Sequence, residues 1–174
     1  MNTDSPFVHQ ASAVAIGGRA LLIEGPPGSG KSSLALALID RGAGLIGDDA
    51  VTLMRTGIRT APQVGTHISD VLMASPPPNI AGLIELRGIG IVQVPVAAPA
   101  PVALVLELGA ARDTTLGERL PETPLPRRVI GGVAVPVLRF DPGTIAPAQR
   151  AEWALALHGT NANPPSLSAA PAQE

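Results

Sequence analysis

The segment Gly25–Ser32 constrains this chain more than any other, because it matches the phosphate-loop pattern G-x-x-x-x-G-K-[ST] at every fixed position. An apolar run, Ala20–Glu24, precedes it and reads as a strand, and Ser33–Arg41 follows with the apolar spacing of a helix. Glycines let backbone N–H groups converge on phosphates, and the helix N-terminus adds partial positive charge. We therefore expect a phosphate-binding loop made of Gly25, Pro26, Pro27, Gly28, Ser29, Gly30, Lys31, Ser32 and Ser33.

Lys31 stands out because it is the one lysine among the 12 basic residues of the chain. A compact ammonium suits the β- and γ-phosphates of a nucleotide, whereas a guanidinium is bulkier and planar and would not substitute freely. The hydroxyl of Ser32 suits Mg²⁺. The alternative is a glycine-rich turn that only caps a helix, and the match at every fixed position, together with the strand before it and the helix after it, disfavours this alternative.

Composition excludes several classes of protein. A length of 174 residues fits one domain, and a hydrophobic fraction of 45% is too high for a disordered chain. The net charge of −2 argues against nucleic acid as a partner, and the absence of cysteine excludes disulfides and thiolate metal sites. No apolar run reaches the roughly 18 residues of a membrane span, and the N-terminus lacks a signal-peptide pattern. We expect a cytoplasmic domain followed by a disordered tail over residues 161–174.

Short apolar runs separated by Gly and Pro predict more strands than helices. The expected strands are Ala11–Ile16, Ala20–Glu24, Gly44–Gly47, Val51–Met54, Gly57–Thr60, Gly82–Leu86, Ile89–Val94, Val102–Leu108 and Val133–Arg139. The first two form a hairpin, as do the fourth and fifth, and Pro136 places the last strand near a sheet edge. The expected helices are Ser33–Arg41 and Ala148–His158, and the expected loops are Asp70–Pro78 and Arg112–Arg128. This pattern favours an α/β fold that is not doubly wound.

Two groups of charged residues are candidates for the rest of a phosphoryl-transfer site. Asp48 and Asp49 follow a predicted strand, where a carboxylate holds a metal or accepts the proton of an attacking hydroxyl. Glu85 lies in the predicted strand Gly82–Leu86 and Arg87 directly follows it, and in an extended chain residues i and i+2 point to one face. The alternatives are a solvated Gly-Asp-Asp turn and an edge strand with a solvated charged face. From the residues alone, an NTPase, a kinase and a nucleotide sensor remain open.

In their order along the chain, these segments resemble the catalytic domain of the HPr kinase/phosphorylase family, bacterial enzymes that phosphorylate a serine of the phosphocarrier HPr. A histidine, His9, precedes the hairpin, as it does in the family. Leu34–Gly42 resembles the family's "TALELIxRG" helix, Gly47–Val51 its "ADDxV", and Ile84–Ile91 its "LEIRGLGI" signature. The resemblance covers about His9–Val94 and is closest to a short, single-domain form of alphaproteobacterial type.

This resemblance implies a fold and a set of roles. The fold would be the phosphoenolpyruvate-carboxykinase-like P-loop architecture, a mixed sheet with few helices, over a single catalytic domain at residues 1–160. The catalytic residues would be Asp48, Lys31, His9 and Arg87, and the Mg²⁺ ligands Ser32, Glu85 and Asp49. Asp48 would be the general base for the seryl hydroxyl. The donor would be ATP, the partner an HPr-like phosphocarrier, and the assembly a homo-oligomer, because the family forms hexamers.

After Val94 the match to the family weakens. Arg112 or Arg119 would replace the active-site arginine of the family's "YDRLG" segment, and Asp141–Thr144 stands where the family has "PGRN". The reverse, phosphate-driven phosphorylase activity would then be weak. Two alternatives follow: a nucleotide-binding sensor or scaffold without transferase activity, and a kinase for a small molecule.

Overall fold

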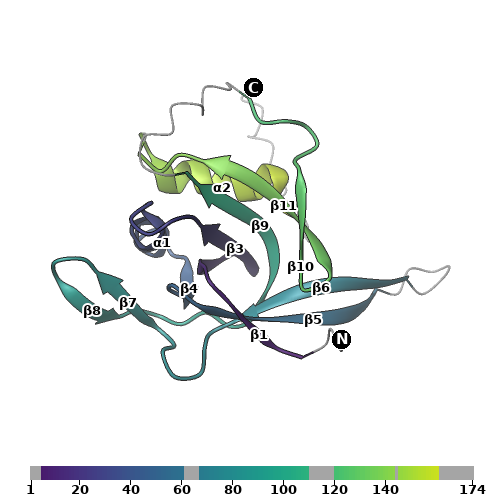
Figure 1. Cartoon of the computed structure of the whole chain (residues 1–174), viewed down its shortest axis with the longest axis horizontal. Helices are drawn as coiled ribbons and strands as arrows, with labels where there is room; N and C mark the ends of the chain where they lie inside the picture. The colour runs from purple at the N-terminus through teal and green to yellow at the C-terminus, as the bar shows by residue number, and fades with distance from the viewer. Residues whose placement is uncertain (1–4, 61–66, 110–119, 144, 161–174) are drawn as a thin grey trace, which may run out of the picture.

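The computed structural model describes residues 5–60, 67–109, 120–143 and 145–160 (Figure 1). Its helices are α1 (Lys31–Ile39) and α2 (Pro147–His158). Its strands are β1 (Phe7–His9), β2 (Ser12–Ile16), β3 (Arg19–Glu24), β4 (Gly44–Gly47), β5 (Val51–Thr60), β6 (His67–Ser75), β7 (Leu83–Leu86), β8 (Gly90–Gln93), β9 (Ala100–Leu108), β10 (Arg127–Ile130) and β11 (Val133–Phe140). The predicted tail at 161–174 lies outside the described residues.

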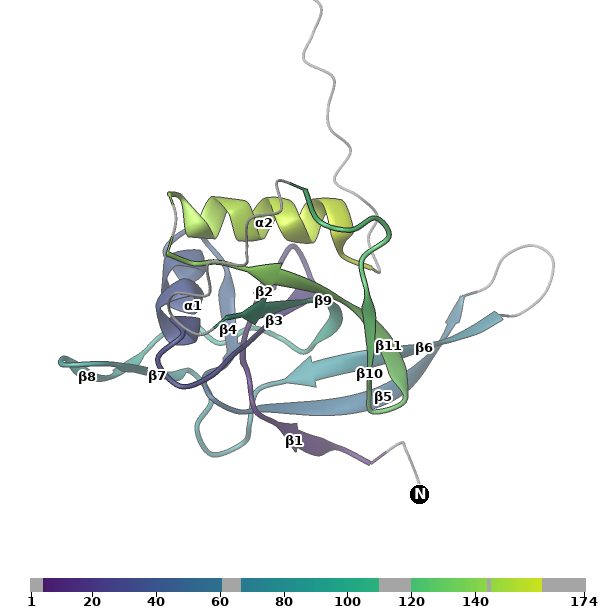
Figure 2. The same ribbon diagram turned by 45° about the horizontal axis from the view of Figure 1, so that its top comes forward.

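Most of the strands form one mixed sheet in the order β1-β5-β6-β9-β3-β2-β4, while β7 and β8 pair separately. Strand β9 is the centre of this sheet: it pairs with β6 at its start, with β11 at its end, and with β3 along its length. Figures 1 and 2 show β5–β6 and β7–β8 extending from opposite ends of the body. The predicted α/β architecture, with a mixed sheet and few helices, is what the described residues adopt.

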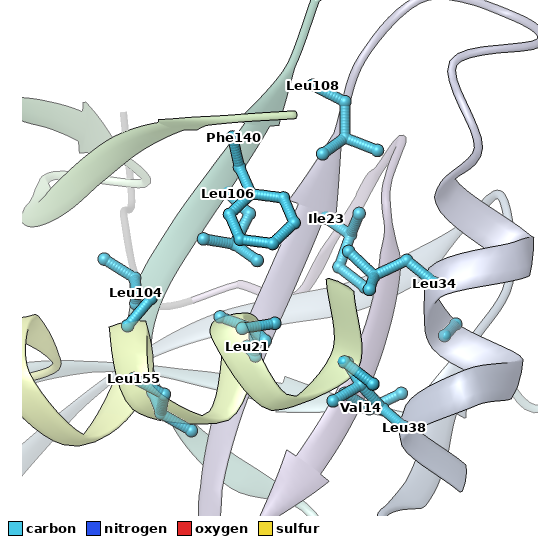
Figure 3. Packing of buried hydrophobic residues seen from close by; sticks show 14 of the residues in the cluster. Val14, Leu21, Ile23, Leu34, Leu38, Leu104, Leu106, Leu108, Phe140 and Leu155 are labelled. Atoms are coloured by element: carbon cyan, nitrogen blue, oxygen red, sulfur yellow. The ribbon is translucent and has the colours of Figure 1, made fainter. Parts of the chain in front are cut away.

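The central strands are buried on both faces, as the strands of an α/β sheet usually are. Successive side chains of a strand point to opposite faces. Leu21, Ile23 and Leu106 therefore pack with the helices, against Leu34 of α1 and Leu155 of α2 (Figure 3). On the opposite face of the sheet, a second apolar cluster packs, and it includes Leu22, Val105, Leu53 and Leu72. This two-sided burial anchors β3, the strand that leads into the phosphate loop.

Many of the local predictions are confirmed. Strands β2 and β3 form the expected hairpin, in which Ala15 lies opposite Ala20. Strand β4 has the predicted bounds, β7 and β8 form a ribbon around Arg87-Gly88, and both helices occur within a residue or two of their predicted limits. No helix in the described part of the chain is long and apolar enough to cross a membrane.

Three predictions of secondary structure were wrong in whole or in part. The expected hairpin of Val51–Met54 and Gly57–Thr60 is one strand, β5, which pairs with β6 from Thr52 to Thr60. The expected loop Asp70–Pro78 begins inside β6, where Val71, Leu72 and Ala74 are buried. Pairing with β6 satisfies the backbone N–H and C=O groups of β5, so that no turn is needed within it. The residues of neither strand give a local signal of this pairing. The expected loop Arg112–Arg128 also runs into a strand, β10, at its end; residues 112–119 lie outside the described residues.

Candidate active site

The phosphate loop connects the buried strand β3 to the first turn of α1, and its backbone requires glycine. Gly25 has φ +152°, and a Cβ atom there would lie 2.7 Å from the carbonyl oxygen of Leu108. Gly30, the N-cap of α1, has φ +95°, in the left-handed region that other residues rarely adopt. These two glycines therefore fix the path by which the loop enters the helix N-terminus.

Two polar side chains of the loop indicate an anion site. The ammonium of Lys31 donates hydrogen bonds to the carbonyl oxygens of Gly25 (3.1 Å) and Pro26 (3.3 Å), so it lies folded across the loop. The hydroxyl of Ser29 is buried and has no hydrogen-bond partner among the described residues. A buried donor without a partner costs free energy, and a bound phosphate oxygen would accept its hydrogen bond. The loop therefore suits a phosphate group.

A cavity of about 540 Å³ lies beside the loop. Lys31 and Ser32 line one side, and Glu85, Arg87 and Asp49 line it as well. Glu85 is on β7 and Arg87 follows this strand. Because both residues line the cavity together with Lys31, the β7–β8 ribbon faces the phosphate loop and is not an edge strand with a solvated charged face. The structure thus brings together most of the residues that the sequence singled out.

The two neighbouring aspartates occupy different surroundings. Asp48 is 7% exposed, and its Oδ1 accepts hydrogen bonds from the hydroxyls of Ser32 (2.9 Å) and Ser12 (2.6 Å). Asp49 has φ +63° and lines the cavity. The alternative of a solvated turn does not hold for Asp48, because that carboxylate is buried against the helix that begins at Lys31.

A second carboxylate, Glu24, ends β3 immediately before the loop. Its Oε1 accepts a hydrogen bond from Nε2 of His9 at 2.8 Å. Its Oε2 accepts one from Arg128, which also donates to Oε1 of Glu107 at 2.6 Å. Burial alone would raise the pKa of Glu24, but the hydrogen bonds and positive charge of His9 and Arg128 outweigh it and hold the pKa below its ordinary value. His9 is therefore linked to the start of the loop by its hydrogen bond to Glu24, the residue before Gly25.

Four residues near the loop were missed by sequence reasoning: Ser12, Glu24, Glu107 and Arg128. Ser12 and Glu24 carried a weak signal, because each is a polar residue in or at the end of an otherwise apolar strand. Arg112 and Arg119, the expected replacements for the family's later arginine, lie outside the described residues. The Asp141–Gly143 turn does lie beside the loop, with Pro142 3.5 Å from the position that a Cβ on Gly30 would take.

The donor set around the cavity suits a metal that arrives with a phosphate ligand. Within the described residues, no group of three or more His, Cys, Asp or Glu side chains is placed to hold a metal alone. Mg²⁺ usually takes one or two carboxylates and completes its shell with phosphates and water. Ser32, Asp49 and Glu85 supply a hydroxyl and two carboxylates beside the loop, which fits that pattern.

A buried strand, a glycine-rich loop with a lysine and a helix N-terminus, all on a mixed sheet, define a P-loop protein. The family described as "HPr Serine kinase C-terminal domain" matches residues 5–141, and the chain belongs to this family. The resemblance seen in the sequence is thereby confirmed.

The relatives agree with this assignment. The HPr kinase/phosphorylase of Acidovorax sp. (strain JS42) is 37% identical over 130 residues, which are 70% of this chain and 36% of that protein. That of Verminephrobacter eiseniae (strain EF01-2) is 35% identical over 130 residues. The solved Hpr(Ser) kinase/phosphatase from Coxiella burnetii superposes with a TM-score of 0.65 at 28% identity, over 84% of this chain and 92% of that chain. The chain spans just over a third of the length of the two curated relatives.

Proposed function

We propose that this protein is an ATP- and Mg²⁺-dependent protein kinase that phosphorylates a serine of an HPr-like phosphocarrier. The observation that carries the proposal is the placement of the loop lysine and the two aspartates around one phosphate site, in a chain of this family. The curated relatives are named HPr kinase/phosphorylase.

The phosphate loop would bind and orient the nucleotide. Its backbone N–H groups and Lys31 would contact the β- and γ-phosphates, so that Lys31 exchanges the carbonyls of Gly25 and Pro26 for phosphate oxygens. Ser32, Asp49 and Glu85 would hold Mg²⁺. A bound Mg²⁺ would neutralise negative charge on the phosphates of the nucleotide. Arg87, which lines the same cavity, would add a positive charge near the transferring group.

Asp48 would act as the general base. The seryl oxygen attacks the γ-phosphorus and forms a new P–O bond, while the bond to the β,γ-bridging oxygen breaks and ADP leaves. The seryl proton passes to the Asp48 carboxylate, whose Oδ2 accepts no hydrogen bond among the described residues. In the reverse direction, an oxygen of inorganic phosphate would attack the phosphorus of the phosphoserine and form pyrophosphate, while the P–O bond to the serine breaks and Asp48 returns the proton to the seryl oxygen. We expect this activity to be weak, because the Asp141–Gly143 segment, which stands where the family has "PGRN", contains no arginine.

The remaining proposals follow from the family resemblance. His9 would contribute at the base of the loop through Glu24, and the protein would act in the cytoplasm as a homo-oligomer. A second candidate is a nucleotide sensor without transferase activity. It is favoured by a contrast between two neighbouring segments. The phosphate loop matches its pattern at every fixed position, whereas the Asp141–Gly143 turn beside it differs from the "PGRN" segment of the family.

The test is a phosphotransfer assay with the purified protein, γ-labelled ATP, Mg²⁺ and the phosphocarriers of the host. We expect label on a phosphocarrier serine and none when that serine is replaced by alanine. The matched control is Lys31→Ala, which should remove both transfer and ATP binding. Tight ATP binding without any phosphoserine would refute the kinase and favour the sensor.

A further inference from the structure

We propose that Ser12 is a positioning residue for Asp48, and this inference rests on the proposed function. Ser12 is the first residue of β2, and its side chain is fully buried. Its hydroxyl donates a hydrogen bond of 2.6 Å to Oδ1 of Asp48, across 36 positions of the chain. Neither the phosphate-loop pattern nor the family signatures quoted above include this serine.

The location of Ser12 explains how it would hold the carboxylate. Strand β2 lies between β3, which leads into the phosphate loop, and β4, which ends just before Asp48. Ala13 pairs with Gly47, and the register shifts between Ala13 and Val14 at this point. Ser12 is therefore anchored to the same rigid sheet as both parts of the site, so its hydroxyl has a fixed position relative to Asp48.

Two hydroxyls converge on one oxygen of Asp48. Ser12 approaches Oδ1 from the sheet, and Ser32 approaches it from α1. Because Oδ1 is occupied twice, rotation of the carboxylate about its Cβ–Cγ bond would break both hydrogen bonds. Oδ2 remains for the seryl proton. Ser32 is also a proposed metal ligand, whereas within the described part of the chain the Ser12 side chain hydrogen-bonds to Asp48 alone.

Neutral donors suit this task better than cations would. A lysine or arginine beside Asp48 would stabilise its negative charge strongly and weaken it as a base. A hydroxyl restrains the geometry with a smaller electrostatic effect. Misplacement of a reacting group by about 1 Å lowers a rate by about 10²-fold. Loss of the Ser12 hydroxyl should therefore affect turnover rather than nucleotide binding.

The experiment compares Ser12→Ala with Ser12→Thr, which keeps a hydroxyl, and with Thr56→Val as a matched control. Thr56 also carries a buried hydroxyl on a strand, but that hydroxyl has no partner among the described residues. We expect Ser12→Ala to lower kcat for phosphotransfer by about 10- to 100-fold with an unchanged KM for ATP. Ser12→Thr should recover most of kcat, and Thr56→Val should match the wild type.

Crystal structures of the wild type and Ser12→Ala form a second arm that does not need transferase activity. If the wild type transfers phosphate and Ser12→Ala is equally fast, the inference is overturned. It is also overturned if kcat, KM and the unfolding midpoint all deteriorate together, since Ser12 would then be merely structural. If the wild type transfers nothing, the proposed function fails, and the Asp48 side chain decides: a displaced carboxylate in Ser12→Ala supports the inference, and an unchanged one overturns it.

Discussion

Two carboxylates flank the phosphate loop, and the protein treats them differently. Among the described residues, Asp48, after β4, is held by neutral hydroxyls alone. Glu24, after β3, is held by His9 and by Arg128, which also binds Glu107. Both are largely buried, yet within the part of the chain that the structure describes only Glu24 has a cationic partner. This difference fits the proposed role of Asp48 as the acceptor of the seryl proton, whereas the Glu24 carboxylate is engaged by partners inside the protein next to the loop.

The largest effect should come from Asp48→Asn. We expect phosphotransfer to fall by about 10²- to 10⁴-fold, because the amide cannot accept the seryl proton, while ATP affinity stays near normal. Single-turnover transfer and equilibrium ATP binding measure the two quantities. The same change on the other side of the loop, Glu24→Gln, is the matched control and should leave most of the transfer activity. Equal loss of transfer and binding in Asp48→Asn would instead assign Asp48 to the metal or to the fold.

Removal of the cation on the Glu24 side should reduce stability. Arg128→Met leaves Glu24 with His9 alone and leaves Glu107 without its closest cation. Hydrogen bonds to charged groups contribute about 1.5–3 kcal/mol, and partial exposure of Arg128 lowers that, so we expect a loss of about 1–2 kcal/mol in the free energy of unfolding. Urea denaturation measures it.

Arg41→Met is the control for this prediction. Arg41 forms an exposed ion pair with Glu152 at 2.8 Å, joining α1 to α2. Exposed pairs of this kind contribute little. If Arg41→Met destabilises the protein as much as Arg128→Met, the Glu24 side has no special structural role.

The smallest effect should be a pH dependence. The pKa of Glu24 lies below its ordinary value of 4.5 in the folded protein, so the unfolded chain takes up a proton first as the pH falls. The stabilisation is fully present above the unfolded pKa and is lost as the pH drops through the folded pKa. Between pH 6 and pH 3, the wild type should therefore lose more unfolding free energy than Glu24→Gln. Parallel curves for the two proteins would contradict the charge pairing.

Sequence reasoning succeeded where the signal was local. The glycines and Lys31 of the phosphate loop, the hairpin before it and the helix after it follow from neighbouring residues, and so does the β7–β8 ribbon. It failed for β5 and β6, because the full length of each strand depends on its pairing with the other, and the local sequence does not indicate that pairing. It missed Ser12 and Arg128 for the same reason: their importance lies in contacts with Asp48 and Glu24, far away along the chain.

The position of Lys31 in the phosphate loop has a practical consequence for chemical labelling. Because the chain has no other lysine, its only primary amines are the Lys31 ammonium and the N-terminal amine. Any attachment chemistry that targets amines, such as coupling to a sensor surface or to a fluorescent dye, would divide between a harmless terminus and the phosphate loop itself. Protection of Lys31 by ATP would then report occupancy of the site directly, by the mass of a single labelled peptide.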